Sequence, residues 1–277
     1  MRFGGPLFQK YGGPDEWIRI VCAAGYRAVF CPVGTEAQES EVRGYEQAAR
    51  AADVTIAEVG AWSNPLSPDA GTRKAALEKC KQSLALADLI GARCCVNIAG
   101  SRGEKWDGPC PLDIRDETVE MIVATVRDII DSVRPCRSFY TLEPMPWMFP
   151  DSADSYLTLL RAVDRPAFAV HFDPVNLINS PGRYFSNADF IRDFIGKLGP
   201  WIKSCHAKDV LLQERLTVHL DEVRPGCGVL DYPALLKGLA GLAGDVPLLL
   251  EHLPDEGEYT AAAAYIRQVA SGAGVAL

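Results

Sequence analysis

Short apolar runs alternate with longer amphipathic segments along the chain, and this alternation restricts the fold more than any single motif does. The apolar runs are rich in branched and aromatic residues, as strands are, and lie at 1–8, 26–32, 55–59, 94–98, 139–144, 168–174, 201–210 and 246–252. The segments after them have apolar residues at helical spacing and lie at 14–24, 45–52, 72–90, 117–133, 155–163, 188–197, 232–242 and 259–270. A strand and a helix therefore alternate eight times.

Eight such units are the number that closes a (β/α)₈ TIM barrel, for which about 250 residues is typical. The composition shows no break along the 277 residues, so we expect a single TIM-barrel domain over 1–277. A doubly wound open sheet is the alternative. That fold usually has fewer strands and a glycine-rich phosphate loop, and no such loop follows the first strand.

The composition is that of an ordinary globular protein, with 48% hydrophobic and 23% charged residues. The net charge of −8 and the absence of a basic run argue against nucleic acid as a partner, because phosphate binding requires clustered Lys and Arg. No window approaches the ~20 apolar residues that cross a bilayer, and the first residues lack the apolar region of a signal peptide. We therefore expect no membrane partner and a cytoplasmic location. The nine cysteines contain no Cys-x-x-Cys pair and are interpreted as core thiols.

Four apolar runs in the second half of the chain close on a side chain that can bind a metal: Glu143, Asp173, His206 and Glu251. In a barrel the C-terminal ends of the strands face one opening, so these residues would converge in space. Their hard oxygen and nitrogen donors suit Mn²⁺ first, and also Co²⁺, Mg²⁺ or Zn²⁺. Taken singly, each could be a salt-bridged acid, a turn residue or a core imidazole. Taken together, one cation explains all four, because buried unpaired carboxylates are costly.

The other three histidines have different expected positions. His171 lies two residues before Asp173, so it points to the same side of the strand one layer deeper, in the core or behind the site. His219 lies in the long loop after the seventh strand and could reach the site. His252 follows Glu251 and should point the opposite way along the strand.

These motifs resemble the xylose isomerase-like TIM barrels, the superfamily that includes ketose 3-epimerases, hydroxypyruvate isomerase, inosose dehydratase and endonuclease IV. The resemblance extends over essentially the whole chain. It is carried by Leu142-Glu143-Pro144, His171-Phe172-Asp173-Pro174-Val175-Asn176, His206-Ala207-Lys208-Asp209-Val210, Arg224-Pro225-Gly226-Cys227-Gly228-Val229-Leu230-Asp231-Tyr232 and Leu250-Glu251-His252.

The resemblance implies a role for each of the four residues. In the epimerases of that superfamily, two glutamates of a Glu, Asp, His, Glu metal shell exchange a proton with the substrate from opposite faces. Carried over, Glu143 and Glu251 would be catalytic acid and base as well as metal ligands, and Asp173 and His206 would mainly hold the metal. The chemistry is sound in itself, because a divalent ion polarises the carbonyl while a carboxylate removes the neighbouring proton.

This sequence departs from the epimerase pattern at two positions. Asn176 stands where the epimerases typically carry a substrate-binding His, and Lys208 stands where they often carry another His. The His-Ala-Lys-Asp-Val form is similar to inosose dehydratase and to metal-dependent deglycosidases that act on oxidised sugars. The expected substrate-binding residues are polar or aromatic side chains near the strand ends: Trp62, Asn64, Asn97, Trp147, Asn176, Lys208 and His219. Each loop residue could also be structural, and Lys208 could form a salt bridge.

We therefore expect a divalent-metal-dependent isomerase or epimerase that abstracts a proton next to the carbonyl of a ketose or keto-sugar, a small-molecule carbohydrate. The alternative is a lyase, either a dehydratase or a deglycosidase of a keto-sugar or inosose, that uses the same enediolate chemistry. An AP endonuclease fits less well, because four histidines cannot supply its three-metal cluster. Retention of all four ligand residues argues against a non-catalytic sugar-binding subunit. Homo-oligomers are common for this architecture, although no segment identifies an interface.

Overall fold

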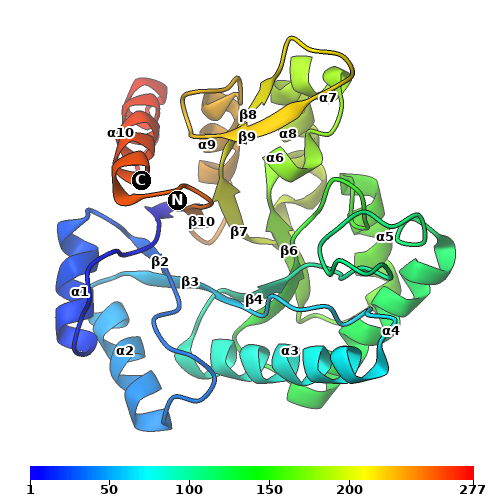
Figure 1. Ribbon diagram of the computed structural model, residues 1–277. Coiled ribbons are helices and arrows are strands. Elements are labelled where there is room, and N and C mark those ends of the chain that lie inside the picture. The colour runs from blue at the N-terminus through cyan, green and yellow to red at the C-terminus, as the bar shows by residue number, and fades with distance from the viewer.

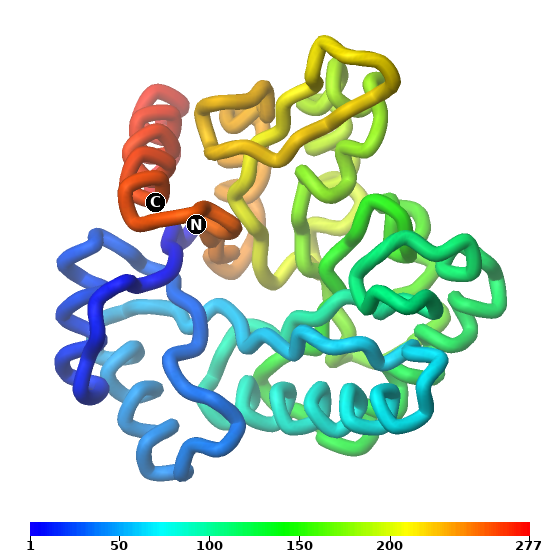
Figure 2. The backbone as a smooth tube through the Cα atoms, in the orientation of Figure 1, coloured from blue at the N-terminus to red at the C-terminus, as the bar shows by residue number.

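The computed structural model describes residues 1–277, and eight parallel strands form a closed barrel at its centre (Figure 1). These strands are β1 (Arg2–Gly4), β2 (Ala28–Phe30), β3 (Thr55–Gly60), β4 (Cys94–Asn97), β5 (Phe139–Leu142), β6 (Phe168–Phe172), β7 (Ile202–Ala207) and β10 (Pro247–Leu250). Their order around the barrel is β1-β10-β7-β6-β5-β4-β3-β2, so the last strand pairs with the first (Figure 2). The predicted (β/α)₈ TIM barrel is confirmed.

Long helices surround the strands (Figure 1). They are α1 (Pro14–Ala23), α2 (Glu39–Ala51), α3 (Ala70–Ile90), α4 (Asp116–Val133), α5 (Ala153–Val163), α8 (Asn187–Leu198), α9 (Tyr232–Ala240) and α10 (Glu256–Ala273). Local capping sets several boundaries: the Asp69 side chain accepts a hydrogen bond from the Thr72 N–H where α3 begins, and Gly91 ends that helix with a φ of 74°. The second helix, predicted to include 45–52, begins at Glu39, where two acidic residues favour its first turn. None of the helices is long and apolar enough to cross a membrane.

The core fills the barrel and the space between strands and helices. All five residues of β6 are buried, as expected for a parallel strand covered on both faces. At Gly4 the β1 and β2 backbones approach so closely that a Cβ would lie 1.6 Å from the Ala28 carbonyl oxygen. Among the nine free cysteines, Cys80, Cys94, Cys95 and Cys205 are buried, as expected. Cys31 and Cys110 are half-buried, and Cys22, Cys136 and Cys227 are exposed, so the interpretation as core thiols holds for only four of them.

The loops after β6 and β7 contain structure that was not predicted. Two short helices, α6 (Pro174–Leu177) and α7 (Pro181–Phe185), precede α8, and a 3₁₀ turn, η1 (Gly199–Trp201), follows it. The predicted long loop after the seventh strand is an antiparallel hairpin of β8 (Asp209–Leu212) and β9 (Leu220–Val223), which extends away from the barrel in Figure 1. Because the two strands are antiparallel and Val210 pairs with Glu222, Glu222 lies close to the end of the barrel from which the hairpin begins.

The Pro-Gly-x-Gly segment after this hairpin has a structural role. The Asp209 carboxylate accepts hydrogen bonds from four backbone N–H groups, those of Val210, Gly226, Gly228 and Leu230. The Tyr232 hydroxyl then donates to the Lys208 carbonyl oxygen at 2.8 Å. This segment therefore fixes the backbone just beyond β7, where Lys208 begins its path into the site.

Candidate metal centre

The four residues at the strand ends meet at one end of the barrel. Glu143, Asp173 and Glu251 each follow the last residue of their strands, β5, β6 and β10, and His206 is the second-last residue of β7. The four strands are neighbours in the barrel wall, in the order β10-β7-β6-β5. One donor atom from each residue lies within 4.8 Å of the others.

The His206 imidazole is at the centre of the group. Its Nδ1 atom lies 2.9 Å from Glu251 Oε2, 3.4 Å from Glu143 Oε1 and 3.8 Å from Asp173 Oδ2. Asp173 and His206 are fully buried, Glu143 is nearly so, and the Glu251 side chain is 14% exposed. The group is thus enclosed by protein, with its most accessible member at Glu251.

The donor set suits a hard divalent cation. Asp173 Oδ2 and Glu251 Oε2 are buried without a hydrogen-bond partner, which is costly unless a positive charge lies beside them. The other Asp173 oxygen, Oδ1, accepts from the backbone N–H groups of Val175 and Asn176 and so fixes the direction of Oδ2. Three carboxylates and one imidazole provide the hard oxygen and nitrogen donors that Mn²⁺ and Mg²⁺ prefer. The residues therefore fit a divalent metal.

Lys208 contributes a positive charge to the same group. Its side chain is 1% exposed, and Nζ lies 2.8 Å from Asp173 Oδ2, 2.9 Å from Glu251 Oε2 and 3.6 Å from Glu143 Oε1. A fourth carboxylate, Glu222 from β9, lies 3.7 Å from Nζ. The ammonium group shares its two nearest oxygens with the candidate metal site, so Lys208 and a cation would compete for the same negative charge.

Burial and charge shift the pKa values of the acids in different directions. Burial raises the pKa of Glu143 to about 7, against the opposing effects of His206 and Lys208. Burial also acts to raise the pKa of Glu251, but the adjacent His206 and Lys208 outweigh it and hold that pKa below its usual value. Lys208 similarly holds the pKa of Asp173 well below its usual range despite burial. The two glutamates thus differ in how readily each takes up a proton.

Glu58 also contacts the group and was not among the predicted site residues. Its carboxylate accepts a hydrogen bond from His206 Nε2 at 2.9 Å, on the ring edge opposite the three acids. A charged residue in an otherwise apolar strand, Thr55-Ile56-Ala57-Glu58-Val59, was the signal that could have identified it.

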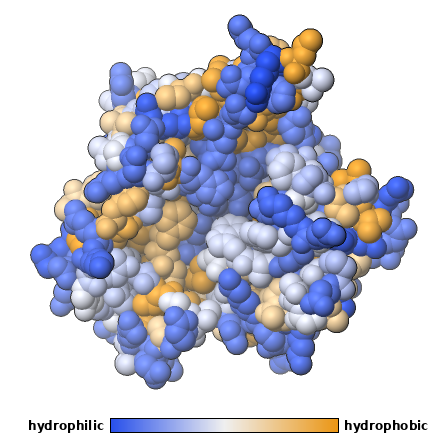
Figure 3. Space-filling view, in the orientation of Figure 1, coloured by the Kyte–Doolittle hydropathy of each residue, from blue (hydrophilic) through white to orange (hydrophobic).

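A cleft of about 530 Å³ opens beside the four residues. Its lining includes three indoles, four acids and few positive groups: Trp62, Ile98, Lys105, Trp106, Asp107, Glu143, Met145, Pro146, Trp147, Asn176, Glu222, Glu251 and His252. The Trp147 Nε1–H donates to the Asp107 carbonyl oxygen at 3.0 Å and ties two of the lining loops together. On the face seen in Figure 3, the hollow in the middle of the barrel is predominantly hydrophilic.

Three of the seven predicted substrate-binding residues line this cleft: Trp62, Trp147 and Asn176. Asn176 donates from Nδ2 to Glu143 Oε1 at 3.0 Å and so orients that carboxylate. Lys208 does not line the cleft but lies behind it, among the acids.

The remaining predicted residues lie elsewhere or point differently. The amides of Asn64 and Asn97 hydrogen-bond to neighbouring loop and helix atoms, among them the Ser101 carbonyl and the Ser63 N–H, and neither residue lines the cleft. His219 lies at the far end of the hairpin, beside Leu220, and does not line the cleft. His252 lines the cleft instead of pointing away from Glu251, because β10 ends at Leu250 and His252 has a φ of 59°, so strand alternation no longer applies.

The family model of the xylose isomerase-like TIM barrels matches residues 18–269. No curated protein sequence matches significantly. Among solved structures, the probable 3-DHS dehydratase AsbF involved in petrobactin synthesis from Bacillus anthracis is 18% identical, with a TM-score of 0.71 over 96% of this chain and 98% of that one. D-psicose 3-epimerase with D-tagatose from Clostridium cellulolyticum H10 is 16% identical, with a TM-score of 0.69 over 97% and 99%. A xylose isomerase-like TIM barrel protein from Mycobacterium smegmatis in complex with magnesium is 15% identical, with a TM-score of 0.66 over 95% and 90%.

Proposed function

Because the chain belongs to the xylose isomerase-like TIM barrel family, we propose that it is a divalent-metal-dependent isomerase or epimerase of a ketose or keto-sugar. The observation that carries this proposal is the convergence of Glu143, Asp173, His206 and Glu251, where three largely buried carboxylates face one imidazole and share the single ammonium group of Lys208. These four residues would hold the cation, and Mn²⁺ is the ion we expect from their donor atoms.

The two glutamates are the proposed acid and base. When bound, a divalent cation supplies Lewis-acid polarisation of a substrate carbonyl. Glu143 extends from β5 and Glu251 from β10. Because β6 and β7 lie between these two strands in the barrel wall, the two carboxylates approach the candidate metal centre from different sides. One carboxylate removes the proton from the carbon beside the carbonyl, and the other returns a proton to that carbon or its neighbour. Asn176 holds Glu143 in place through its amide.

The cleft favours an uncharged polyhydroxylated substrate. Glu143, Glu222, Glu251 and Asp107 line it, against Lys105 and His252, so an anionic substrate would meet a largely negative wall. Three arginines in the segments after β4, β6 and β9 have other partners: Arg102 bonds to Thr118, Arg183 to the Leu177 carbonyl and Arg224 to Glu258. The indoles supply flat apolar surfaces for sugar C–H groups, and the acids can accept hydrogen bonds from hydroxyls.

A lyase that uses the same residues is the second candidate. After proton removal, loss of a β-leaving group would give dehydration or cleavage of a glycosidic bond. Two features favour a lyase as the second candidate: a probable dehydratase is among the structural neighbours, and this chain carries Lys208 and Asn176 at positions where the resemblance implies histidines in the epimerases. DNA repair fits less well, because the cleft wall is acidic and phosphate binding requires positive charge.

The test is solvent exchange of substrate protons followed by NMR in D₂O. The chelator-treated protein, with and without added Mn²⁺, is incubated with a panel of ketoses, inososes and 3-keto-glycosides. We expect Mn²⁺-dependent deuterium incorporation next to the carbonyl, together with a new isomer or epimer. Incorporation with loss of water or of an aglycone would establish the lyase instead. Sugar binding without exchange, despite bound Mn²⁺, would mean a non-catalytic binding protein and would refute both.

A further inference from the structure

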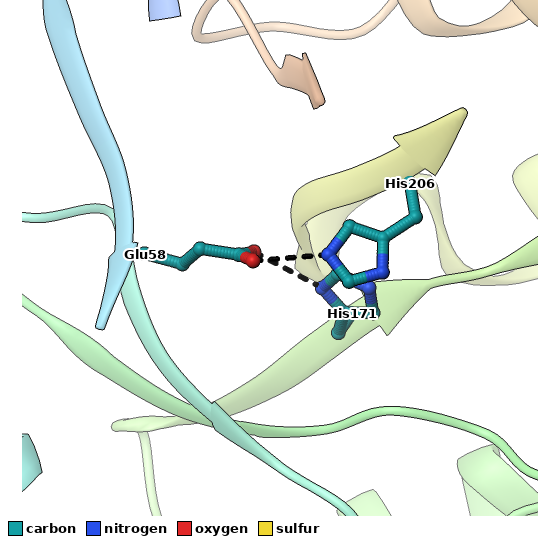
Figure 4. A group of neighbouring side chains, drawn as sticks. All are labelled: Glu58, His171 and His206. Carbon is teal, nitrogen blue, oxygen red and sulfur yellow. Dashed lines mark hydrogen bonds and ion pairs between the residues drawn. The ribbon is translucent and has the colours of Figure 1, made fainter. Parts of the chain in front are cut away.

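The carboxylate of Glu58, inside the barrel, contacts the His206 ring on the edge opposite the candidate metal ligands. Glu58 extends from β3, on the other side of the barrel from β7, and only 2% of it is exposed (Figure 4). Its Oε1 lies 2.9 Å from His206 Nε2, and its Oε2 lies 3.6 Å from His171 Nδ1. Glu58 thus connects strands that are not neighbours in the barrel wall.

The two nitrogens of His206 have different surroundings. Nδ1 faces the carboxylates of Glu143, Asp173 and Glu251, whereas Nε2 faces Glu58 alone. An ionised carboxylate can only accept a hydrogen bond, so the proton belongs on Nε2. Nδ1 is then the nitrogen that faces the acids, and when a cation takes the place of the proton that Nδ1 shares with them, its lone pair is free to bind that cation.

His171 packs against His206 and lies beside Glu58. The His171 and His206 rings pack edge to face, with centroids 4.1 Å apart, and limit rotation of His206. His171 Nδ1 is itself bonded to Ser204 Oγ at 2.6 Å, and Ser204 Oγ lies 3.2 Å from Cys94 Sγ. The orientation of His206 is therefore determined by a buried polar cluster: Glu58, Cys94, His171 and Ser204.

We propose that Glu58 is a positioning residue of the metal centre, which fixes the orientation and tautomer of His206 so that Nδ1 faces the cation. This inference rests on the proposed metal-dependent function. Such carboxylate–histidine–metal arrangements orient the ring and strengthen the ligand. The competing explanation is that Glu58 only satisfies two buried histidines, but a carboxylate deep in a barrel is costly, and apolar residues would fill the same space without that cost.

The test compares Mn²⁺ affinity in the wild type, Glu58→Gln and a matched control. Thr118→Val is the control, because it removes a buried hydroxyl from α4 that donates to the Leu112 carbonyl and accepts from Arg102, and none of these residues contacts the metal centre or the cluster around His206. Mn²⁺ binding is measured by calorimetry or EPR on folded protein. We expect Glu58→Gln to weaken binding by about 10- to 100-fold, as loss of such a partner typically does, and Thr118→Val to change it by less than about twofold. Binding by folded Glu58→Gln within about twofold of the wild type would overturn the proposal.

A second measurement does not depend on the metal. In ¹⁵N-histidine-labelled protein, the Nε2–H proton of His206, assigned with His206→Gln, should be far downfield and protected from exchange in the wild type. Glu58→Gln should move it upfield, because a neutral amide is a weaker acceptor. If the wild type fails to bind Mn²⁺, the metal-dependent function is refuted, and this resonance still decides whether Glu58 orients His206. An unchanged resonance in Glu58→Gln would refute that role as well.

Discussion

Replacing Lys208 with Met tests whether its ammonium group balances the acids of the metal centre. The side chain is 1% exposed and lies within 3.7 Å of four carboxylates: Glu143, Asp173, Glu222 and Glu251. Met keeps an unbranched apolar chain but removes the charge. Removing one partner of a buried ion pair leaves the other charge uncompensated and costs about 3–5 kcal/mol. We expect a loss of that size in the free energy of unfolding of the metal-free protein.

The assay is thermal unfolding of chelator-treated protein with and without Mn²⁺. For a chain of this size, 1 kcal/mol corresponds to about 2–4 °C, so metal-free Lys208→Met should unfold about 6–20 °C below the wild type. A ligand at 1,000 times its Kd stabilises by about 4.1 kcal/mol, so saturating Mn²⁺ should restore most of the loss. The stabilisation by Mn²⁺ should be larger in Lys208→Met than in the wild type, because no ammonium competes for Asp173 and Glu251.

The matched control is Lys197→Met. Lys197 Nζ lies 3.0 Å from both Asp154 and Asp193, but its side chain is 37% exposed, so its loss should lower the free energy of unfolding much less than the loss of Lys208 does, and the effect should be insensitive to Mn²⁺. The reasoning is refuted if metal-free Lys208→Met is as stable as Lys197→Met, or if Mn²⁺ stabilises Lys208→Met less than it stabilises the wild type.

Three further outcomes follow from the site. Glu143→Gln and Glu251→Gln should each lower substrate proton exchange by about 10²- to 10⁴-fold with an unchanged circular dichroism spectrum, and full activity in either variant would remove the acid/base assignment. Because burial raises the pKa of Glu143 to about 7, a proton must leave this carboxylate before a metal binds below that pH. A Mn²⁺ titration from pH 5 to 8 should therefore show affinity that falls below pH 7 with a slope approaching about tenfold per pH unit, and Glu143→Gln should lose this step. Trp147→Ala should raise KM by about 2- to 12-fold with a smaller effect on kcat, whereas Trp201→Ala, which lies outside the cleft, should leave both unchanged.

The barrel was predictable because its signal repeats. Each strand is a compact apolar run and each helix has its own period and boundaries, so the fold follows from the alternation even where an edge is wrong. The hairpin of β8 and β9 was not predictable in this way. Its strands have four residues each, and a long-range contact fixes the turn after it: the Asp209 carboxylate binds N–H groups as far away as Leu230. Nothing local in the sequence indicates that contact.

For the same reason, some residues of the candidate site could be predicted from the sequence and others could not. Glu143, Asp173, His206 and Glu251 could be placed together because barrel topology alone brings strand ends together. Glu58 could not, since its role depends on which side chain lies across the barrel interior, 148 positions away in sequence. Asn64 and Asn97 have the same chemistry as sugar-binding amides, but their own loops supply their hydrogen-bond partners, and only the folded structure distinguishes the two roles.

The unequal surroundings of the two glutamates assign them different starting states. Glu251 lies 2.9 Å from both His206 Nδ1 and Lys208 Nζ, whereas Glu143 lies 3.4 and 3.6 Å from the same atoms. The positive groups therefore favour the charged form of Glu251 more strongly, and Glu143 takes up a proton at less cost. We infer that Glu251 removes the substrate proton and that Glu143, after it has taken up a proton from solvent in the loaded enzyme, supplies the new one. Each turnover would leave Glu251 protonated and Glu143 charged, so both must exchange with solvent before the next. The first product molecules formed in D₂O should then carry one deuterium at the new centre, as mass spectrometry can measure. Product free of deuterium would mean that a single carboxylate carries the same proton throughout, and would refute the two-base assignment.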